Sequence, residues 1–184
     1  KDQYDIFNRS LIPALEKEGV HVLSHYENLS DKQSKYVDRY FMREVYPVLT
    51  PMAVDSSRPF PLIRNKSLNI AALLMDKKRK DTIDFATVQV PSVLPRIVTI
   101  PSEKEGETCI ILLEQIIEKN IQKLFLNYKV LDATPYRVMR NADLTIDEDE
   151  AADLLIEIER QLKKRQWGEA IRLEVEQGID KRLL

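Results

Sequence analysis

The sequence predicts a single α+β domain in which a mixed or largely antiparallel sheet packs with about four helices. Two strand-length apolar runs, 67–75 and 83–90, flank a charged link suited to a hairpin. Residues 112–125 carry apolar side chains with the period of a helix, whereas residues 171–175 alternate with a period of two. Hairpin-linked strands and separate helices do not keep strict strand–helix alternation, which favours α+β over a parallel α/β fold.

Residues 1–46 are expected to form a helical lead-in and residues 47–184 the sheet-containing core. Apolar residues spaced by three and four predict a first helix with one apolar stripe, formed by Tyr4, Phe7, Leu11, Ala14 and Leu15. This helix should end near Gly19, and Pro13 should kink it or begin a second piece.

A second helix is predicted after a short β-prone run at 20–23. Ser30 and Gln33 have the spacing of a capping box, which satisfies exposed backbone donors at a helix start. The helix should end before Pro47. The side chains expected to point inward are Val37, Tyr40 and Phe41.

The segment 47–61 is rich in proline, which fixes φ and removes backbone donors, so an irregular loop is expected there. The run RIVTI at 96–100 predicts a further strand, as does 136–140. One face of the 112–125 helix carries Leu113, Ile116, Ile117, Ile121 and Leu124.

A last helix is predicted from Asp147, where Asp147 and Glu150 provide an acidic cap. Its apolar stripe comprises Ala151, Leu154, Leu155, Ile158 and Leu162. After Gly168, the alternation at 171–175 predicts a strand with one face in water.

The composition of the chain argues against several classes of function. The chain of 184 residues carries 28 Lys plus Arg against 30 Asp plus Glu, so no global positive field favours nucleic acid or an anionic membrane. A single cysteine, Cys109 in an apolar setting, allows no intrachain disulfide or thiolate cluster and suits a reducing cytosol. No run is long enough for a transmembrane helix, and no signal peptide is visible, so a cytoplasmic protein is expected.

No complete catalytic constellation is found in the sequence. His21 and His25 have a spacing that suits a metal site on a helix, but this segment looks extended, and along a strand four residues span roughly 13 Å. We therefore expect structural histidines, with a metal hydrolase as the alternative. The four glycines are too far apart for a phosphate-binding loop.

Charged clusters have ordinary explanations beside functional ones. The acidic residues Asp147, Glu148, Asp149 and Glu150 suit a hard cation but also a helix start. The basic run 77–80 is typical of a solvated hairpin tip. The candidate phosphate-facing residues are Arg58, Arg64, Arg137 and Arg140, since guanidinium forks match phosphate oxygens, although salt bridges explain them equally well.

Three segments in order, 46–74, 88–101 and 136–176, closely resemble the middle or head domain of the bacterial polyphosphate kinases. They read YPVLTPMAVDSSRPFPLIRNKSLNIAALL, VQVPSVLPRIVTIP and YRVMRNADLTIDEDEAADLLIEIERQLKKRQWGEAIRLEVE. Met139 departs from the Thr common at that position, and the resemblance covers essentially the whole chain.

The resemblance implies a parent enzyme that reversibly moves the γ-phosphoryl of ATP through a phosphohistidine to polyphosphate, with Mg²⁺. In that family, catalytic residues belong to flanking N-terminal and C-terminal domains, so we expect this chain to have no catalytic, cofactor-binding or metal-binding residues of its own. We expect an internal segment of a larger protein, since it begins on Lys1 and stops inside an apolar pattern.

The resemblance also implies the partners of the segment. These are its own flanking kinase domains and a second copy, because the family's head domain is associated with dimer formation. The segment would then hold protomers together and brace the catalytic tunnel. The alternative is a phosphate-binding module whose arginines line the path of polyphosphate. For the full enzyme, peripheral membrane association is an alternative to a purely cytoplasmic location.

Overall fold

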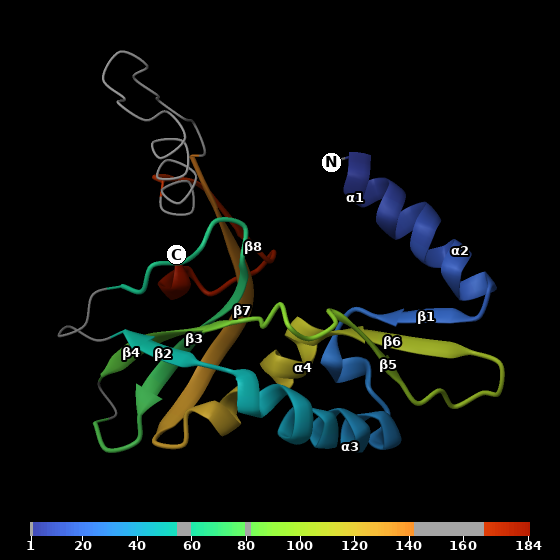
Figure 1. Cartoon of the computed structure of the whole chain (residues 1–184), viewed down its shortest axis with the longest axis horizontal. Helices are drawn as coiled ribbons and strands as arrows, with labels where there is room; N and C mark the ends of the chain where they lie inside the picture. The colour runs from blue at the N-terminus through green and yellow to red at the C-terminus, as the bar shows by residue number, and fades with distance from the viewer. Residues whose placement is uncertain (1, 55–59, 80–81, 142–167) are drawn as a thin grey trace, which may run out of the picture. The chain divides into compact units, whose positions relative to one another are not determined.

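The computed structural model describes residues 2–54, 60–79, 82–141 and 168–184 (Figure 1). It confirms the α+β class with mixed and antiparallel sheets. In the described residues none of the helices combines the length and apolar character that a bilayer crossing requires. The helix expected from Asp147 lies outside the described residues, as does the acidic run at its start.

The chain forms two compact units, each assembled from two stretches of sequence. One unit comprises Lys1–Leu49 and Val90–Leu126, and the other comprises Thr50–Gln89 and Asn127–Leu184. Each unit has a sheet of its own. The division at residue 46 expected from the sequence stays a prediction.

The predicted N-terminal helix is confirmed. Segments α1 (Asp2–Ile6) and α2 (Ile12–Lys17) are joined by a π-helical turn at Phe7–Leu11, which directly precedes the first turn of α2 with Pro13. A proline lacks a backbone donor and so interrupts the regular hydrogen bonding of a helix at this point. These segments run on as one helix, and the described residues contain three of the about four helices expected, since the helix from Asp147 lies outside them. None of the apolar side chains of this N-terminal helix is fully buried.

The capping box predicted for α3 (Asp31–Tyr40) is confirmed. The Gln33 backbone donates to Ser30 Oγ at 3.4 Å, and the Ser30 backbone donates to Gln33 Oε1 at 3.0 Å. A second π-helical turn, Phe41–Val45, extends the helix. Val37 and Phe41 are buried as predicted, but Tyr40 is only half-buried, because a row spaced by four residues fills the core side of this helix.

The sheet of the first unit has three strands in the order β1–β6–β5. Strands β1 (Val20–Leu23) and β6 (Thr108–Leu112) are parallel, whereas β5 (Ile97–Ile100) is antiparallel to β6. The strand predictions at 20–23 and 96–100 are confirmed. Strand β6 was not predicted, since its short apolar run leads without a break into α4 (Leu113–Asn120) and the following 3₁₀ turn.

The core of the first unit is mostly aliphatic. Three predicted members of the α4 stripe, Leu113, Ile116 and Ile117, have no exposed surface. Cys109 is buried and unpaired. The other buried apolar residues of this unit are Val37, Phe41, Val45, Val98, Ile100, Ile111, Ile121 and Phe125.

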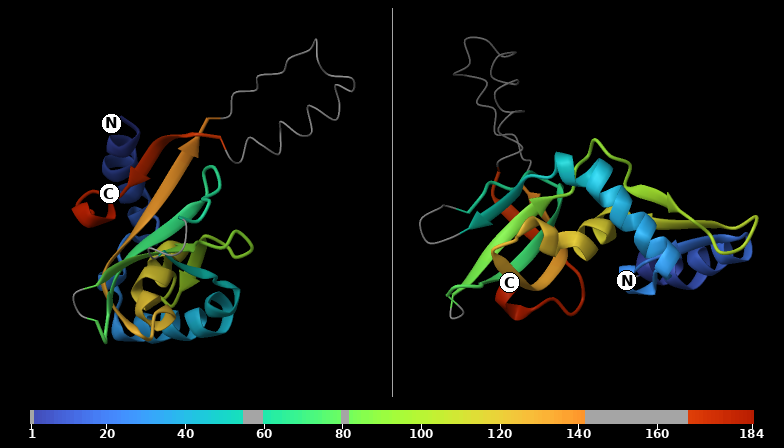
Figure 2. Two further views of the ribbon diagram at one scale, coloured as in Figure 1. Left: turned by 90° about the vertical axis from the view of Figure 1, so that its left-hand side faces the viewer. Right: turned by 90° about the horizontal axis from the view of Figure 1, so that it is seen from below.

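The second unit contains a five-stranded antiparallel sheet in the order β2–β4–β3–β7–β8, and Figure 2 shows β8 running along β7. The predicted hairpin is confirmed in the pairing of β3 with β4. A buried hydrogen bond of 2.7 Å joins Thr87 Oγ1 and the Tyr136 hydroxyl. The strands are β2 (Pro51–Val54), β3 (Leu68–Asp76), β4 (Ile83–Gln89), β7 (Tyr128–Arg140) and β8 (Ala170–Val175).

Strand β2 corrects the expectation of an irregular loop over 47–61. It pairs with β4 at the edge of the sheet and begins at Pro51. A proline is tolerated at the first residue of an edge strand because no ladder donor is lost there. Only part of the proline-rich segment is therefore irregular in the described residues.

The strand predicted at 136–140 is confirmed but is much longer, since β7 begins at Tyr128. The strand predicted at 171–175 is also confirmed as β8. Its apolar face was expected to be covered, yet Ile171, Leu173 and Val175 are all exposed, because β8 forms the outer edge of the sheet.

Candidate functional site

The candidate phosphate-facing arginines differ in their surroundings. Arg58 lies outside the described residues. Arg64 is exposed in the segment before β3, and its carbonyl accepts hydrogen bonds from the backbone and hydroxyl of Ser67. No ion pair of Arg64 is found in the described part of the chain.

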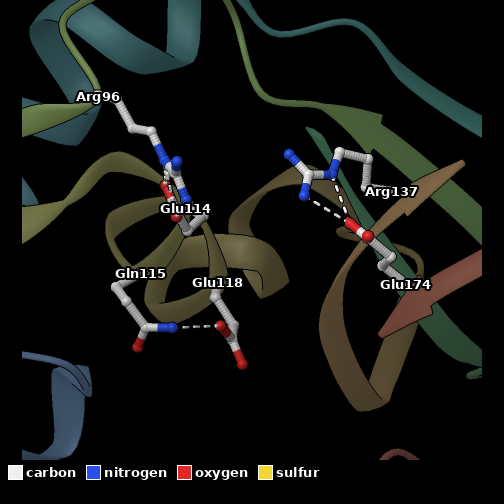
Figure 3. Close-up of polar contacts among 6 residues, drawn as sticks. All are labelled: Arg96, Glu114, Gln115, Glu118, Arg137 and Glu174. Atoms are coloured by element: carbon white, nitrogen blue, oxygen red, sulfur yellow. Dashed lines mark hydrogen bonds and ion pairs between the residues drawn. The ribbon is translucent and has the colours of Figure 1, made fainter. Parts of the chain in front are cut away.

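Arg137 forms an ion pair across two strands. It lies opposite Glu174 in the β7–β8 register, and its Nε donates to Glu174 Oε2 at 2.7 Å (Figure 3). Arg172 Nη2 lies 3.3 Å from the other carboxylate oxygen. The hydrogen bond from Arg137 lowers the pKa of Glu174. The guanidinium of Arg137 thus has a carboxylate partner within the protein.

Arg140 joins three segments of the second unit. Its Nε donates to the Ile63 carbonyl at 2.8 Å, and its Nη1 donates to the Gly168 carbonyl at 2.9 Å. Its backbone N–H donates to Asn65 Oδ1 at 2.9 Å. Among the described residues Arg137 and Arg140 share no partner, so this part of the structure does not assemble them into one anion site, and their role toward phosphate stays a prediction.

The two histidines lie in extended backbone, as expected. His21 is in β1, and its Nε2 is 3.1 Å from Glu107 Oε2 without the alignment of a hydrogen bond. His25 is exposed beyond the end of the strand. Over the described ranges, no three His, Cys, Asp or Glu side chains come together to hold a metal ion. These residues therefore do not fit a magnesium or zinc centre.

A buried carboxylate lies at the start of α4. Glu114 is 5% exposed and accepts hydrogen bonds from Arg96 Nη2 at 2.6 Å and Nε at 3.1 Å (Figure 3). This hydrogen bonding raises the pKa of Arg96. In the next residue, Gln115 Oε1 accepts from the Tyr26 backbone, and Gln115 Nε2 donates to Glu118 Oε2 at 3.0 Å. All these groups are engaged in holding the fold.

A groove along α3 combines cations with aromatic side chains. It has a volume of about 630 Å³. Five of its residues lie on one side of the helix and its π-helical extension, at spacings of three and four. The lining residues are Tyr36, Arg39, Tyr40, Arg43, Glu44, Leu94 and Pro95. We call this the α3 groove.

The charges of the α3 groove are weakly compensated. Arg43 Nη2 is 3.9 Å from Glu44 Oε1, and both side chains are at least half exposed. For Arg39, the described part of the chain shows no ion pair. Burial raises the pKa of Tyr40, and the charges of Glu44 and Tyr36 act in the same direction. Two guanidinium groups and two phenols therefore face the same groove.

Sequence reasoning missed Arg39 and Arg43. It assigned Val37, Tyr40 and Phe41 to the apolar stripe of this helix but gave no role to the two arginines. The available signal was the sequence YxxRYxxR at 36–43, in which tyrosine and arginine alternate at helical spacing. This pattern does not show that Leu94 and Pro95 close the other wall, because they lie about fifty residues away in sequence.

The known proteins that this chain resembles are polyphosphate kinases. The family model described as the polyphosphate kinase middle domain matches residues 32–184. The polyphosphate kinase of Halalkalibacterium halodurans is 47% identical over 174 residues, which cover 95% of this chain and 24% of the relative. That of Bacillus cereus is 47% identical over 186 residues, covering 99% of this chain and 26% of the relative.

A solved structure gives the same result at the level of the fold. The crystal structure of polyphosphate kinase from Porphyromonas gingivalis matches with a TM-score of 0.69 and 26% sequence identity. The match covers 89% of this chain and 27% of that chain. The present chain thus spans about a quarter of the length of these relatives.

Proposed function

Because the chain belongs to the polyphosphate kinase family and matches its middle domain, we propose that it is the non-catalytic head domain of an ATP:polyphosphate phosphotransferase. The parent enzyme transfers the γ-phosphoryl group of ATP reversibly to polyphosphate through a phosphohistidine. ATP, Mg²⁺ and the reacting histidine belong to its flanking domains. The share of the relatives that this chain spans, about a quarter of their length, supports this division.

Dimerisation and bracing of the catalytic tunnel are the functions proposed for this domain. The supporting observation is apolar surface that its own core does not use. On β8, Ile171 and Leu173 are 65% and 49% exposed, and the outer edge of this strand has no neighbour in the described sheet. An apolar edge strand is a liability unless another chain or segment covers it. We assign the β8 face to contact with a second copy.

The N-terminal helix offers a separate apolar surface. Tyr4, Phe7 and Leu11 are 75%, 45% and 48% exposed and follow one another at helical spacing. We assign this stripe to packing against a flanking kinase domain. The alternative function, a phosphate path lined by the arginines of the second unit, has less support, because Arg137 and Arg140 already have protein partners.

A domain exchange tests the proposed function. Residues 1–184 should show no ATP-dependent polyphosphate synthesis alone. In place of the matching segment of the Bacillus cereus kinase, to which they are 47% identical, they should support synthesis of polyphosphate. Turnover by the isolated chain comparable with that of an intact kinase would contradict the proposal, as would a folded exchange protein without activity.

A separate variant tests whether the β8 face forms the contact with a second copy. Leu173→Asp in the exchange protein should shift light scattering toward the monomer mass across a concentration series, because the charge would have to be buried in the contact. Ile83→Asp is the matched control, since Ile83 is 47% exposed on another strand of the same sheet. If both variants keep the same mass as the parent, the β8 face is not the dimer contact.

A further inference from the structure

The α3 groove has the donor chemistry of an anion site. Arg39 and Arg43 are one helical turn apart and both line it. A guanidinium offers a planar fork of donors that matches two oxygens of a phosphate group. Two forks at this spacing can each bind one phosphate of the same chain.

These guanidinium groups are available for a ligand. Other arginines of this chain are held by carboxylates at short distances, for example Arg96 and Arg182 at 2.6 Å. In contrast, the 3.9 Å contact of Arg43 with Glu44 is long, and Arg43 is 81% exposed. Such a surface pair contributes little, so an anion with more oxygens can displace it.

The aromatic residues make the groove more than a charged surface. Tyr36 and Tyr40 are half-buried and alternate with the two arginines along the helix. Their hydroxyls are donors for phosphate oxygens, and burial raises the pKa of Tyr40. Leu94 and Pro95 supply an apolar opposite wall.

The local backbone is unusual at the same place. In the π-helical turn Phe41–Val45, the Tyr46 N–H donates to the Phe41 carbonyl rather than to the carbonyl four residues back. π-Helical turns of this kind recur at functional sites.

We infer that the α3 groove binds a linear oligophosphate anion, with Arg39 and Arg43 on successive phosphate groups and the hydroxyls of Tyr36 and Tyr40 as further donors. Among the lining residues that the structure describes, Glu44 is the one carboxylate, and it opposes the anion. The inference rests on the proposed function only in the choice of probe, because phosphoanhydride chains are the substrate class of that enzyme.

Isothermal titration of the 184-residue chain with inorganic tripolyphosphate at low salt tests the inference. Arg39→Ala and Arg43→Ala should each weaken binding about tenfold, because each removes a charge-assisted pair of hydrogen bonds. Glu44→Gln should strengthen binding about threefold, because it removes a like charge. Arg9→Ala is the matched control, since Arg9 is 82% exposed on the N-terminal helix and outside the groove.

ATP serves as a second probe that identifies the source of the phosphates. Equal affinity for ATP and tripolyphosphate assigns the groove to the inorganic chain. Tighter binding of ATP shows that a tyrosine stacks on the base. Both results support an oligophosphate site. Competition by sulfate at equal ionic strength, absence of binding, or an equal loss in Arg9→Ala would overturn the inference. Circular dichroism of each variant verifies folding. This binding result is separate from the turnover that tests the proposed function.

Discussion

Removal of Arg96 should destabilise the first unit through Glu114, the carboxylate at the start of α4. The Glu114 side chain is 6% exposed, and Arg96 contacts it through Nη2 at 2.6 Å and through Nε at 3.1 Å. Loss of one partner from a buried pair costs about 3–5 kcal/mol, because a charge is left without compensation. The Arg96 side chain is 61% exposed, so water replaces part of the lost interaction, and we expect about 2 kcal/mol for Arg96→Ala.

The assay is denaturant unfolding followed by circular dichroism, with the free energy of unfolding compared between variants. Adding Glu114→Gln to Arg96→Ala should recover about 1 kcal/mol, because a neutral amide is less costly to bury than an unpaired carboxylate. Arg43→Ala serves as the control and should change the free energy by less than about 0.5 kcal/mol, since its pair is exposed.

Two results would refute this reasoning. One is an Arg96→Ala variant whose free energy of unfolding equals that of the parent chain, which would mean that water reaches Glu114 freely. The other is an absence of recovery when Glu114→Gln is added. Destabilisation without recovery would show that Arg96 acts through the packing of its aliphatic stem rather than through the charge of Glu114.

Three further predictions concern stability. Ile116→Ala should lower the free energy of unfolding by about 3 kcal/mol, because Ile116 is fully buried and leaves a cavity. Asp38→Asn should lower it by about 0.5–1 kcal/mol at pH 7, since Lys119 Nζ lies 2.6 Å from Asp38. Burial alone would raise the pKa of Asp38, but Lys119 lowers it below 3.8, so this contribution is present above that pH and is lost as the pH falls through the lowered pKa. Gly168→Ala should shift the melting temperature down, because an added Cβ would lie 2.1 Å from the Asn141 carbonyl oxygen.

Each of these predictions has a control. Val93→Ala, at a residue 78% exposed, should leave stability unchanged and is the reference for Ile116→Ala. The difference between Asp38→Asn and the parent chain should vanish in unfolding curves recorded well below pH 3.8, and a constant difference at all pH values would contradict the ion-pair account. Gly178→Ala is the companion of Gly168→Ala, since a Cβ at Gly178 meets no atom within 4 Å although its φ is positive. Gly168 has no positive φ, so unchanged stability of Gly168→Ala would contradict the clash, whatever the loss in Gly178→Ala.

Local signals in the sequence predicted much of the secondary structure. The capping box of Ser30 and Gln33 was confirmed because both of its hydrogen bonds lie within one helical turn. The hairpin of β3 and β4 was confirmed because its strands are neighbours in sequence and in the sheet. Strand β2 was missed because the high proline content of 47–61 predicted an irregular loop. An edge strand can nevertheless begin with a proline, as β2 does at Pro51.

The candidate site was less predictable. The candidate arginines were chosen because a guanidinium group can bind phosphate. The identity of the residue does not show whether a carboxylate of the same protein already pairs with it. Arg137 has such a partner in Glu174, which depends on a strand register between residues 37 apart. Arg39 and Arg43 lack a close partner within the described residues and were not chosen. Whether an arginine side chain can bind a ligand therefore depends on the residues that folding places beside it.

The sequence by itself determined the α+β class, most of the helices and strands and the family resemblance, because these depend on residue patterns within a few turns or strands. The tertiary structure decided that β1 pairs in parallel with β6 and that His21 lies beside Cys109 in that register. It also decided that the apolar residues of β8 remain exposed and that the α3 groove closes against Leu94. These pairings join residues far apart in sequence, and their stability comes from surface buried jointly, which no local pattern encodes.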